Sequence, residues 1–401
     1  MTIARAGAAY VENNNYIYAI AGVDGKNFLS SIERAKVNPD GSLSEWEVIS
    51  QLPEPRGFTS AVVRRNRLYV IGGGNGPYGE NLLNSVVSAE LKPNGDVGQW
   101  RTESSHMLLP RRCAKVFVKK DNLYAVGGFG GNLLDSVEAA KFSANDTLEE
   151  WHLFEEKLNL PRYVNALKKV GNLVLAIGGH DAHSGKGIAQ VEYLDTEQSS
   201  MTWQEASAMQ QGRYAFAGVT VGERVFAMGG LSGTEYLDNI EYIEQKDIRA
   251  GKAWQASSQL PLKMANFAAL NIDNRIYLFG GSTRSTYLNK VWYAKVNDQG
   301  KIGYWGAPEV LEKQINKPRE ELASQLPNSG VVLERIASGD YVYMRVKDKN
   351  NERWLAAPIN NIPVNSKVRF SEGVLMSNFY SKSLKRAFST ILFVGIIEED
   401  K

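Results

Sequence analysis

The segment Leu68-Tyr-Val-Ile-Gly-Gly73 joins an apolar run to two glycines, and the chain of 401 residues repeats this pattern six times. The repeats are 51, 55, 51, 51 and 51 residues apart, measured between their last residues, Gly22, Gly73, Gly128, Gly179, Gly230 and Gly281. A tryptophan follows each repeat after 23 to 27 residues, at Trp46, Trp100, Trp151, Trp203, Trp254 and Trp305. A period near 50 residues indicates one supersecondary unit repeated around an axis.

Each unit predicts four β-strands. The first follows a basic residue, as in Arg56-Gly-Phe-Thr-Ser-Ala-Val-Val63, and the apolar run is the second. Because this run has no polar alternation, both of its faces are expected to be covered. The third strand alternates, as in Ser136-Val-Glu-Ala-Ala-Lys-Phe142, and the fourth begins at the tryptophan. A four-stranded sheet cannot hide two apolar faces alone, so neighbouring sheets are expected to stack face to face around a channel.

The paired glycines, the tryptophan and a basic residue 9 to 12 residues beyond it resemble kelch repeats over residues 1–306. The resemblance implies an all-β fold, with a six-bladed kelch β-propeller at residues 1–307. The first repeat departs from the pattern because Ala21 replaces its first glycine. All six units carry their own four strands, and the sequence does not show which segment joins the first blade to the last.

The residues after Trp305 predict a second, smaller domain. Residues 308–328 are interpreted as a linker with a short helix that begins at Pro318. Five strand-like runs then predict a C-terminal five-stranded OB-like barrel at residues 329–401, namely Val331–Ile336, Tyr341–Val346, Arg353–Ala357, Lys367–Val374 and Ile391–Ile397.

Short motifs in this region, in Tyr341–Val346, Arg353–Pro358 and Asn378–Phe388, resemble the NrfJ-related family of small OB-type modules in bacterial extracytoplasmic proteins. The resemblance implies export to the periplasm or cell surface and no known catalysis. No basic-then-apolar signal segment opens the chain at Met1, so we expect that any signal peptide lies outside this sequence.

Composition and motifs exclude several function classes. Lys and Arg number 46 against 44 Asp and Glu, so a net charge of +2 provides no strong field toward nucleic acid or membrane. A single cysteine, Cys113, excludes an intramolecular disulfide and cysteine-ligated clusters, and it is interpreted as a small buried hydrophobe. The glycines of Gly74–Gly79 satisfy G-x-G-x-x-G, but a strand follows them where a dinucleotide site needs a helix. We therefore predict no cofactor and no catalytic residues.

The first candidate site is a ring of basic residues that precede the innermost strands: Arg5, Arg56, Arg112, Arg162, Arg213 and Lys263. A closed ring would bring them to one mouth of the channel, where they would favour acidic ligands or partner loops. The kelch resemblance implies partner peptides at this entrance. The alternative is that each side chain fixes its own inter-blade loop through backbone carbonyls. The recurring Glu33, Glu138, Glu192 and Glu241 are expected to be architectural, bonding a neighbouring backbone or cation.

The second candidate site is the set of loops after the glycine pairs, which vary in length and chemistry. They offer aromatic contacts and one charge, at Phe28, Tyr78, Phe129, Tyr236, Tyr287 and Arg284. The alternative is that these residues only cover their own loops. His180 and His183, with Asp181, could ligate zinc or copper, although the sequence fixes no third protein ligand outside this loop, and exposed loop histidines are the alternative.

These observations predict a non-enzymatic binding protein whose propeller recognises a protein segment, with acidic segments favoured by the basic mouth. The kelch resemblance also implies an alternative, a lectin or sugar-processing propeller, since one six-bladed member is a sialic-acid epimerase. A third alternative is single-stranded nucleic acid on the terminal barrel, where basic residues alternate with aromatics at Tyr341, Tyr343, Trp354, Phe379 and Tyr380.

Overall fold

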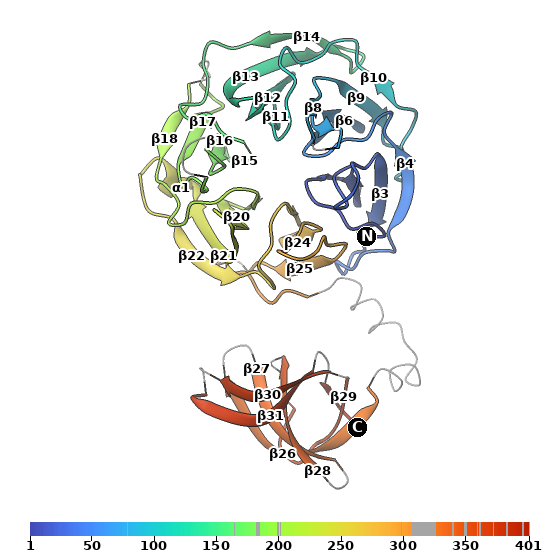
Figure 1. The fold of residues 1–401 in the computed structure, drawn as a ribbon, viewed down its shortest axis with the longest axis vertical. Helices are drawn as coiled ribbons and strands as arrows, with labels where there is room; N and C mark the ends of the chain where they lie inside the picture. The colour runs from blue at the N-terminus through green and yellow to red at the C-terminus, as the bar shows by residue number, and fades with distance from the viewer. Residues whose placement is uncertain are drawn as a thin grey trace. The chain divides into compact units, whose positions relative to one another are not determined.

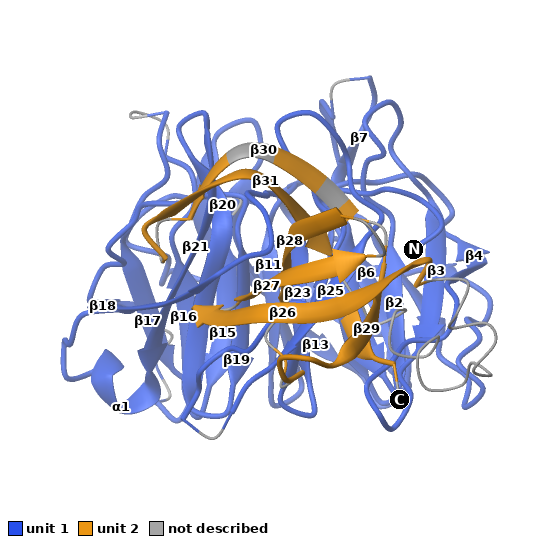
Figure 2. Cartoon of the chain, turned by 90° about the horizontal axis from the view of Figure 1, so that it is seen from below, with its two compact units in different colours: residues 1–311 blue, residues 312–401 orange. Residues whose placement is uncertain are grey.

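The chain forms two compact units, Met1–Leu311 and Glu312–Lys401, which Figure 2 colours separately. The structure is a computed structural model that describes residues 1–77, 79–163, 165–181, 185–198, 200, 202–297, 299–306, 326–338, 341–348, 351–358, 360, 362–371, 373–381, 384–394 and 397–400. The predicted linker helix falls almost entirely outside these residues. In the parts described, no helix is both long enough and apolar enough to cross a membrane.

Unit 1 is a ring of six antiparallel sheets, one for each repeat (Figure 1). The first three sheets each have four strands. Blade 1 contains β1 (Ala9–Asn13), β2 (Tyr16–Ile20), β3 (Ser31–Lys36) and β4 (Glu47–Gln51). Blade 2 contains β5 (Ser60–Arg64), β6 (Arg67–Ile71), β9 (Val86–Glu90) and β10 (Arg101–Thr102), with a hairpin of β7 (Gly74–Asn75) and β8 (Asn81–Leu82) in its loop. Blade 3 contains β11 (Lys115–Lys119), β12 (Asn122–Phe129), β13 (Leu133–Phe142) and β14 (Leu148–Leu153).

Blades 4 and 5 repeat this order and blade 6 repeats its first three strands, so the prediction of a six-bladed all-β propeller is confirmed. The predicted fourth strand of blade 6 is not found among the described residues. Blade 4 contains β15 (Ala166–Val170), β16 (Leu173–Ile177), β17 (Val191–Asp195) and β18 (Gln204–Ala206). Blade 5 contains β19 (Ala217–Val221), β20 (Arg224–Ser232), β21 (Glu235–Glu244) and β22 (Gln255–Gln259), and the short helix α1 (Gln245–Ile248) follows β21. Blade 6 contains three strands: β23 (Ala268–Ile272), β24 (Arg275–Phe279) and β25 (Val291–Lys295).

Apolar contacts between neighbouring blades form the core of the ring. The second strand of each blade is buried because blades cover both of its faces, as predicted from its continuous apolar run. Each repeat tryptophan packs against the second strand of the preceding blade. Trp254 lies in one cluster with Leu173 and Leu175 of β16, and Trp46 lies in one cluster with Tyr277 and Phe279 of β24. The second of these clusters joins blade 6 to blade 1.

The ring closes without exchange of a strand between the two ends of the propeller, as far as the described residues extend. In every blade, the last residue of the glycine motif donates its backbone amide to a carbonyl at the start of the next blade. The last of these bonds runs from Gly281 to Arg5 at 2.8 Å. The place of a fourth strand in blade 6 is taken by an isolated bridge between Tyr293 and Gly306. Backbone bonds and apolar packing therefore seal the ring.

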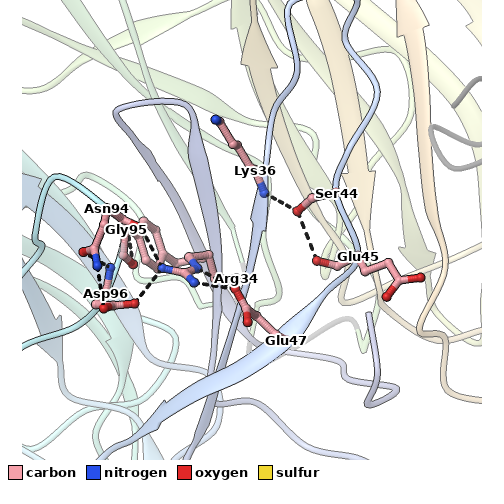
Figure 3. Close-up of polar contacts among 9 residues, drawn as sticks. Arg34, Lys36, Ser44, Glu45, Glu47, Asn94, Gly95 and Asp96 are labelled. Carbon is pink, nitrogen blue, oxygen red and sulfur yellow. Dashed lines mark hydrogen bonds and ion pairs between the residues drawn. The ribbon is translucent and has the colours of Figure 1, made fainter.

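Polar contacts also connect neighbouring blades at the turns between third and fourth strands. Figure 3 shows Arg34 of β3, whose guanidinium donates to Asp96 and to the carbonyl of Asn94 in blade 2, at 2.9 and 3.0 Å. The same guanidinium donates to Glu47 of its own blade. Tyr18 donates its hydroxyl to the carbonyl of Gly95 at 2.9 Å, and burial raises its pKa to about 12. Blade 1 is thus fastened to blade 2 by both charge and hydrogen bonds.

Unit 2 contains a mixed sheet of seven strands, so the prediction of a five-stranded OB-like barrel is not confirmed. Its order is β30 (Gly373–Ser381), β31 (Arg386–Val394), β28 (Asn351–Pro358), β27 (Tyr341–Asp348), β26 (Asn328–Ser338), β29 (Lys367–Phe370) and β32 (Ile397–Glu399). Among the described strands of this sheet, only β28 and β31 pair in parallel. The predicted run Lys367–Val374 spans two strands because the chain changes partner, from β26 to β31, between Phe370 and Gly373.

Candidate functional site

The arginines that begin the blades are buried. Arg5, Arg56, Arg162 and Arg213 have no exposed surface, so they do not present a basic rim to a partner. Arg213 donates to the carbonyls of Gly229 and Asn239 and to Glu241, the last at 2.6 Å. Burial lowers the pKa of Arg162 and Arg213, and the neighbouring glutamates oppose that shift. These four arginines therefore fit the alternative interpretation, in which each side chain fixes the backbone of its own blade.

Two of the six predicted positions were misassigned by one residue. Hydrogen-bond register identifies Arg111 as the equivalent in blade 3, because its amide donates to Leu83 as the amide of Arg162 does to Leu134. In blade 6 the equivalent is the buried Met264, whose amide donates to Leu237. Lys263 instead lies at the surface, 3.4 Å from Glu235.

The recurring glutamates are the partners of these arginines, which confirms that they are architectural. Glu33 contacts Arg5 at 2.6 Å and accepts the backbone amides of Thr2 and Ile3 at 2.5 and 3.1 Å. Burial raises the pKa of Glu33, but the Arg5 charge and the hydrogen bonds outweigh it and hold the pKa below its usual value. The other three copies repeat this arrangement, in the pairs Arg111–Glu138, Arg162–Glu192 and Arg213–Glu241.

The two exceptions show that arginine and glutamate form one unit. In blade 2, Val87 occupies the position on the third strand where four other blades have the glutamate. Arg56 is paired there with Glu54 instead, at 2.7 Å. In blade 6 both partners are absent, since Met264 replaces the arginine and Trp292 occupies the glutamate position opposite Leu278. The loss of both charges together avoids an unpaired buried charge.

A second ring of equivalent backbone contacts involves the residues that directly follow the buried ring in the sequence. In each blade the residue after the buried arginine or Met264 forms a backbone bridge to the residue after the glycine motif. These bridges are Ala6–Val23, Gly57–Gly74, Arg112–Phe129, Tyr163–His180, Tyr214–Leu231 and Ala265–Ser282. Blades 1, 2 and 6 place small or short side chains here, whereas blades 3, 4 and 5 place large ones.

The large side chains form a continuous arc of contacts across blades 3, 4 and 5, which we call the aromatic arc: Arg112, Phe129, Tyr163, His180 and Tyr214. The Arg112 guanidinium lies 5.1 Å from the centre of the Phe129 ring. Ring centres are then 5.7 Å apart from Phe129 to Tyr163, 5.2 Å from Tyr163 to His180 and 4.8 Å from His180 to Tyr214. All five side chains are half-buried.

The arc combines apolar ring surface with polar groups. Burial raises the pKa values of Tyr163 and Tyr214, so both hydroxyls stay protonated at neutral pH. Tyr214 donates its hydroxyl to the carbonyl of Gly233 at 2.7 Å, and Arg112 donates to the carbonyl of Gly79 at 3.0 Å. Half-buried aromatic rings with polar ends are the residue type that dominates protein recognition surfaces.

The sequence identified three members of this arc and missed two. Arg112, Phe129 and His180 are sequence candidates, Arg112 as a member of the predicted basic ring at the channel mouth and the other two as loop residues. Tyr163 and Tyr214 were missed, and the available signal was their position directly after Arg162 and Arg213.

The other predicted loop residues that the structure describes are not part of the arc. Phe28 lies against Gly57 and Gly79 of the next blade, and Tyr287 lies against Gly25, so both cover neighbouring loops. Tyr236 is half-buried opposite Leu231, whereas Arg284 is exposed. Tyr78 and His183 lie outside the described residues. Among the described residues, no group of three or more His, Cys, Asp or Glu could hold a metal ion.

In unit 2 the predicted aromatics divide between core and surface. Tyr343 stacks on Phe388 in a buried cluster that Trp354 and Phe379 contact. Tyr341 and Tyr380 are exposed. Two of the five predicted aromatics therefore lie at the surface of unit 2, and the other three belong to this cluster.

Comparisons with known proteins agree with this architecture. The Kelch motif matches residues 4–34 and 263–293, which lie in the first and last blades. Tip elongation aberrant protein 1 of Schizosaccharomyces pombe is 23% identical over 233 residues, covering 52% of this chain and 20% of that protein. Beta-scruin of Limulus polyphemus is 25% identical over 206 residues, covering 50% of this chain and 22% of its own. This chain therefore spans about a fifth of the length of these relatives.

Further similarities come from a third relative and a solved structure. Kelch-like protein 35 of Mus musculus is 27% identical over 181 residues, covering 45% of this chain and 28% of that protein. The structure of YjhT superposes with a TM-score of 0.62 at 15% identity, covering 76% of this chain and 98% of its own, and shows the fold alone. These three relatives are eukaryotic, so they give no support to the expected bacterial source. Unit 1 is a six-bladed β-propeller with Kelch motifs in its first and last blades.

Proposed function

We propose that this protein is a binding scaffold that recognises a segment of a protein partner on the aromatic arc. The observation that carries the proposal is the contact series from Arg112 to Tyr214, which crosses three successive blades. The rigid ring holds these side chains in place, so little side-chain entropy is lost on binding. Similarity to the Kelch-like proteins and scruins supports a scaffold role.

The buried arginines change the expected partner. Four of the six predicted cations have no exposed surface, and three of those four contact a buried glutamate. The mouth therefore carries less positive charge than the sequence predicted, and aromatic stacking replaces charge as the main attraction. Arg112, which contacts Phe129 within the arc, remains to donate hydrogen bonds to a carboxylate of the partner.

A capture experiment with matched variants tests this proposal. The full chain is compared with Tyr163→Ala/Tyr214→Ala, and with Leu153→Ala, which changes an exposed apolar residue on the outer strand β14. We expect wild type and Leu153→Ala to retain the same partner proteins and the double variant to lose them. Recovery of identical partners by all three, with the double variant folded by circular dichroism, would contradict the proposal.

A carbohydrate ligand is the second candidate, because Tyr163 and Tyr214 provide the tyrosines that such a site needs beside basic residues. Both rings contact His180, and Asp181 follows directly in the chain. Aromatic faces with nearby hydrogen-bond donors suit the surface of a sugar ring. Binding of the full chain to a glycan array, lost in the same double variant, would favour this candidate over a protein partner.

We also infer an OB-like strand order for unit 2. Strands β29 and β30 are separated by two residues, as are β31 and β32. If β29 and β30 are counted as one long strand, and β31 and β32 as another, the sheet has five strands. The two edge strands of the sheet, β30 and β32, then belong to these two long strands. The parallel pairing of β28 with β31 and the antiparallel pairing of β26 with β29 support this order. Exchange protection of the paired amides across β29–β32, measured by NMR, tests it.

A further inference from the structure

The inner strands of the propeller surround a cavity of about 200 Å³ at its centre. All six blades contribute to its wall, which consists mainly of small or apolar residues such as Ala9, Ala61, Ala217, Gly218 and Ala268. Its volume lies below the range of about 300 to 1,000 Å³ that is usual for drug-sized ligands. A ligand that fits here is therefore small.

Two lysines in this wall depart from the pattern of the repeats. The first position of the inner strand, defined by its pairing with the second strand, holds Lys115 in blade 3; the other blades hold Ala9, Ser60, Ala166, Ala217 and Ala268 there. The third position holds Lys168 in blade 4; the other blades hold Val11, Val62, Phe117, Val219 and Leu270. Departures from a repeat pattern that cost stability are expected at functional sites.

Neither lysine is neutralised by the protein. The structure gives neither Lys115 nor Lys168 an ion pair, and no Asp or Glu is among the residues that line the cavity, all of which are described. The other titratable group in the wall is Tyr10, whose pKa burial raises. Burial also lowers the pKa of both lysines, and the charge of Lys115 lowers that of Lys168 further. The two positive charges lie close enough to repel each other in a poorly solvated space.

An amide without partners lies in the same wall. Asn165 is 2% exposed, and both its side-chain nitrogen and its side-chain oxygen lack a hydrogen-bond partner. A buried amide without partners costs free energy, so it indicates a group that completes its hydrogen bonds. The side chain of Lys168 packs over Gly218. A Cβ atom at position 218 would lie only 3.2 and 3.3 Å from the Cγ and Cε atoms of Lys168, so a larger residue there would crowd the lysine.

We propose that the central cavity binds a small oxyanion with two negative charges, held by the ammonium groups of Lys115 and Lys168 and by the amide of Asn165. Two charges on the ligand match the two lysines, and its oxygens accept from the amide nitrogen of Asn165. Inorganic phosphate and a short dicarboxylate share this chemistry. The site is independent of the aromatic arc, since it uses inner-strand residues that take no part in the contacts of the arc.

Titration calorimetry of the full chain at about pH 7 tests the site with inorganic phosphate and with succinate, each up to roughly 10 mM. We expect at least one of them to bind with one site per chain. Lys115→Met and Lys168→Met should each weaken it roughly tenfold or more, as loss of one charge-assisted contact implies. Lys169→Met, which changes an exposed lysine on the same strand, should leave the affinity unchanged. Binding of phosphate alone would identify the ligand as a phosphate, and binding of succinate alone would identify it as a dicarboxylate.

Thermal unfolding without added anion separates this role from a structural one. Removal of an uncompensated, poorly solvated charge should raise the melting temperature of Lys115→Met and Lys168→Met by a few degrees. The proposal is overturned if neither probe binds the wild type, or if binding survives both substitutions. It is also overturned if Lys115→Met and Lys168→Met melt below the wild type while Lys115→Arg and Lys168→Arg melt with it, because the lysines would then have a structural role.

Discussion

The hydroxyl of Tyr277 in blade 6 donates a hydrogen bond to the carbonyl of Gly41 in blade 1, at 2.7 Å. Tyr18 makes the same contact with Gly95 between blades 1 and 2, and Tyr69 makes it with Asp146 between blades 2 and 3. The closing junction of the ring therefore uses the same contact as two internal junctions, although its two sides come from opposite ends of unit 1.

Tyr277→Phe should lower the free energy of unfolding by about 1 kcal/mol, because it leaves a buried carbonyl without its donor. Tyr18→Phe removes the equivalent bond at an internal junction and is the matched control. We expect equal shifts of the two urea denaturation midpoints. A shift in Tyr18→Phe alone would show that the closing junction contributes less than an internal one.

Arg213→Met should destabilise the fold by about 3 to 5 kcal/mol, since it leaves Glu241 buried without a cation. The double variant Arg213→Met/Glu241→Leu copies the apolar solution that blade 6 uses at Met264 and Trp292. It should recover part of the loss, although the amides of Gln210 and Gln211 lose their acceptor. Thermal unfolding measures both, and a double variant less stable than the single one would contradict this reasoning.

Acid should weaken the fold partly through Glu33. Its pKa in the folded state is held below the ordinary 4.5 by the Arg5 charge and the hydrogen bonds to Thr2, against the opposing effect of burial. Its contribution to stability is therefore complete above pH 4.5 and is lost as the pH falls through the folded pKa. Glu33→Gln should be less stable near neutral pH and should show a flatter loss of stability below pH 4.5 than wild type.

Alkaline pH should act in the opposite direction through Lys168. Burial and the Lys115 charge lower its pKa from 10.5 to about 8, so the unfolded chain binds the proton more tightly than the folded one. Stability should then rise between pH 8 and 10.5 in wild type relative to Lys168→Met. Denaturation midpoints of the two proteins across this range measure the difference, and parallel curves would show that the lysine is freely solvated.

The glycine spacing predicted the ring, and the same spacing identifies the buried position that precedes each inner strand. Arg5, Arg56, Arg111, Arg162, Arg213 and Met264 are separated by 51, 55, 51, 51 and 51 residues, the same steps as the glycine motifs. Arg112 and Lys263 break this spacing by one residue. Selection by charge instead of by spacing therefore chose the half-buried Arg112 and the exposed Lys263 in place of the buried Arg111 and Met264.

The aromatic arc and the lysines of the cavity could not be predicted in the same way, because both depart from the repeat. Tyr163 and Tyr214 become neighbours only through His180, which belongs to the loop between them. Lys115 and Lys168 lie 53 residues apart, and only the curvature of the ring brings blades 3 and 4 together at the centre. In unit 2 the strand runs were visible, but the change of partner after Phe370 depends on tertiary pairing.

Each of the first five sheets takes all of its strands from one uninterrupted stretch of the chain. Within unit 1, the polypeptide can therefore be cut between two of these blades without dividing any sheet. Duplication of one repeat would likewise add a whole sheet to the ring. A propeller built in this way is open to cuts between blades and to changes in blade number that an interlocked ring, with one sheet shared between both ends, resists.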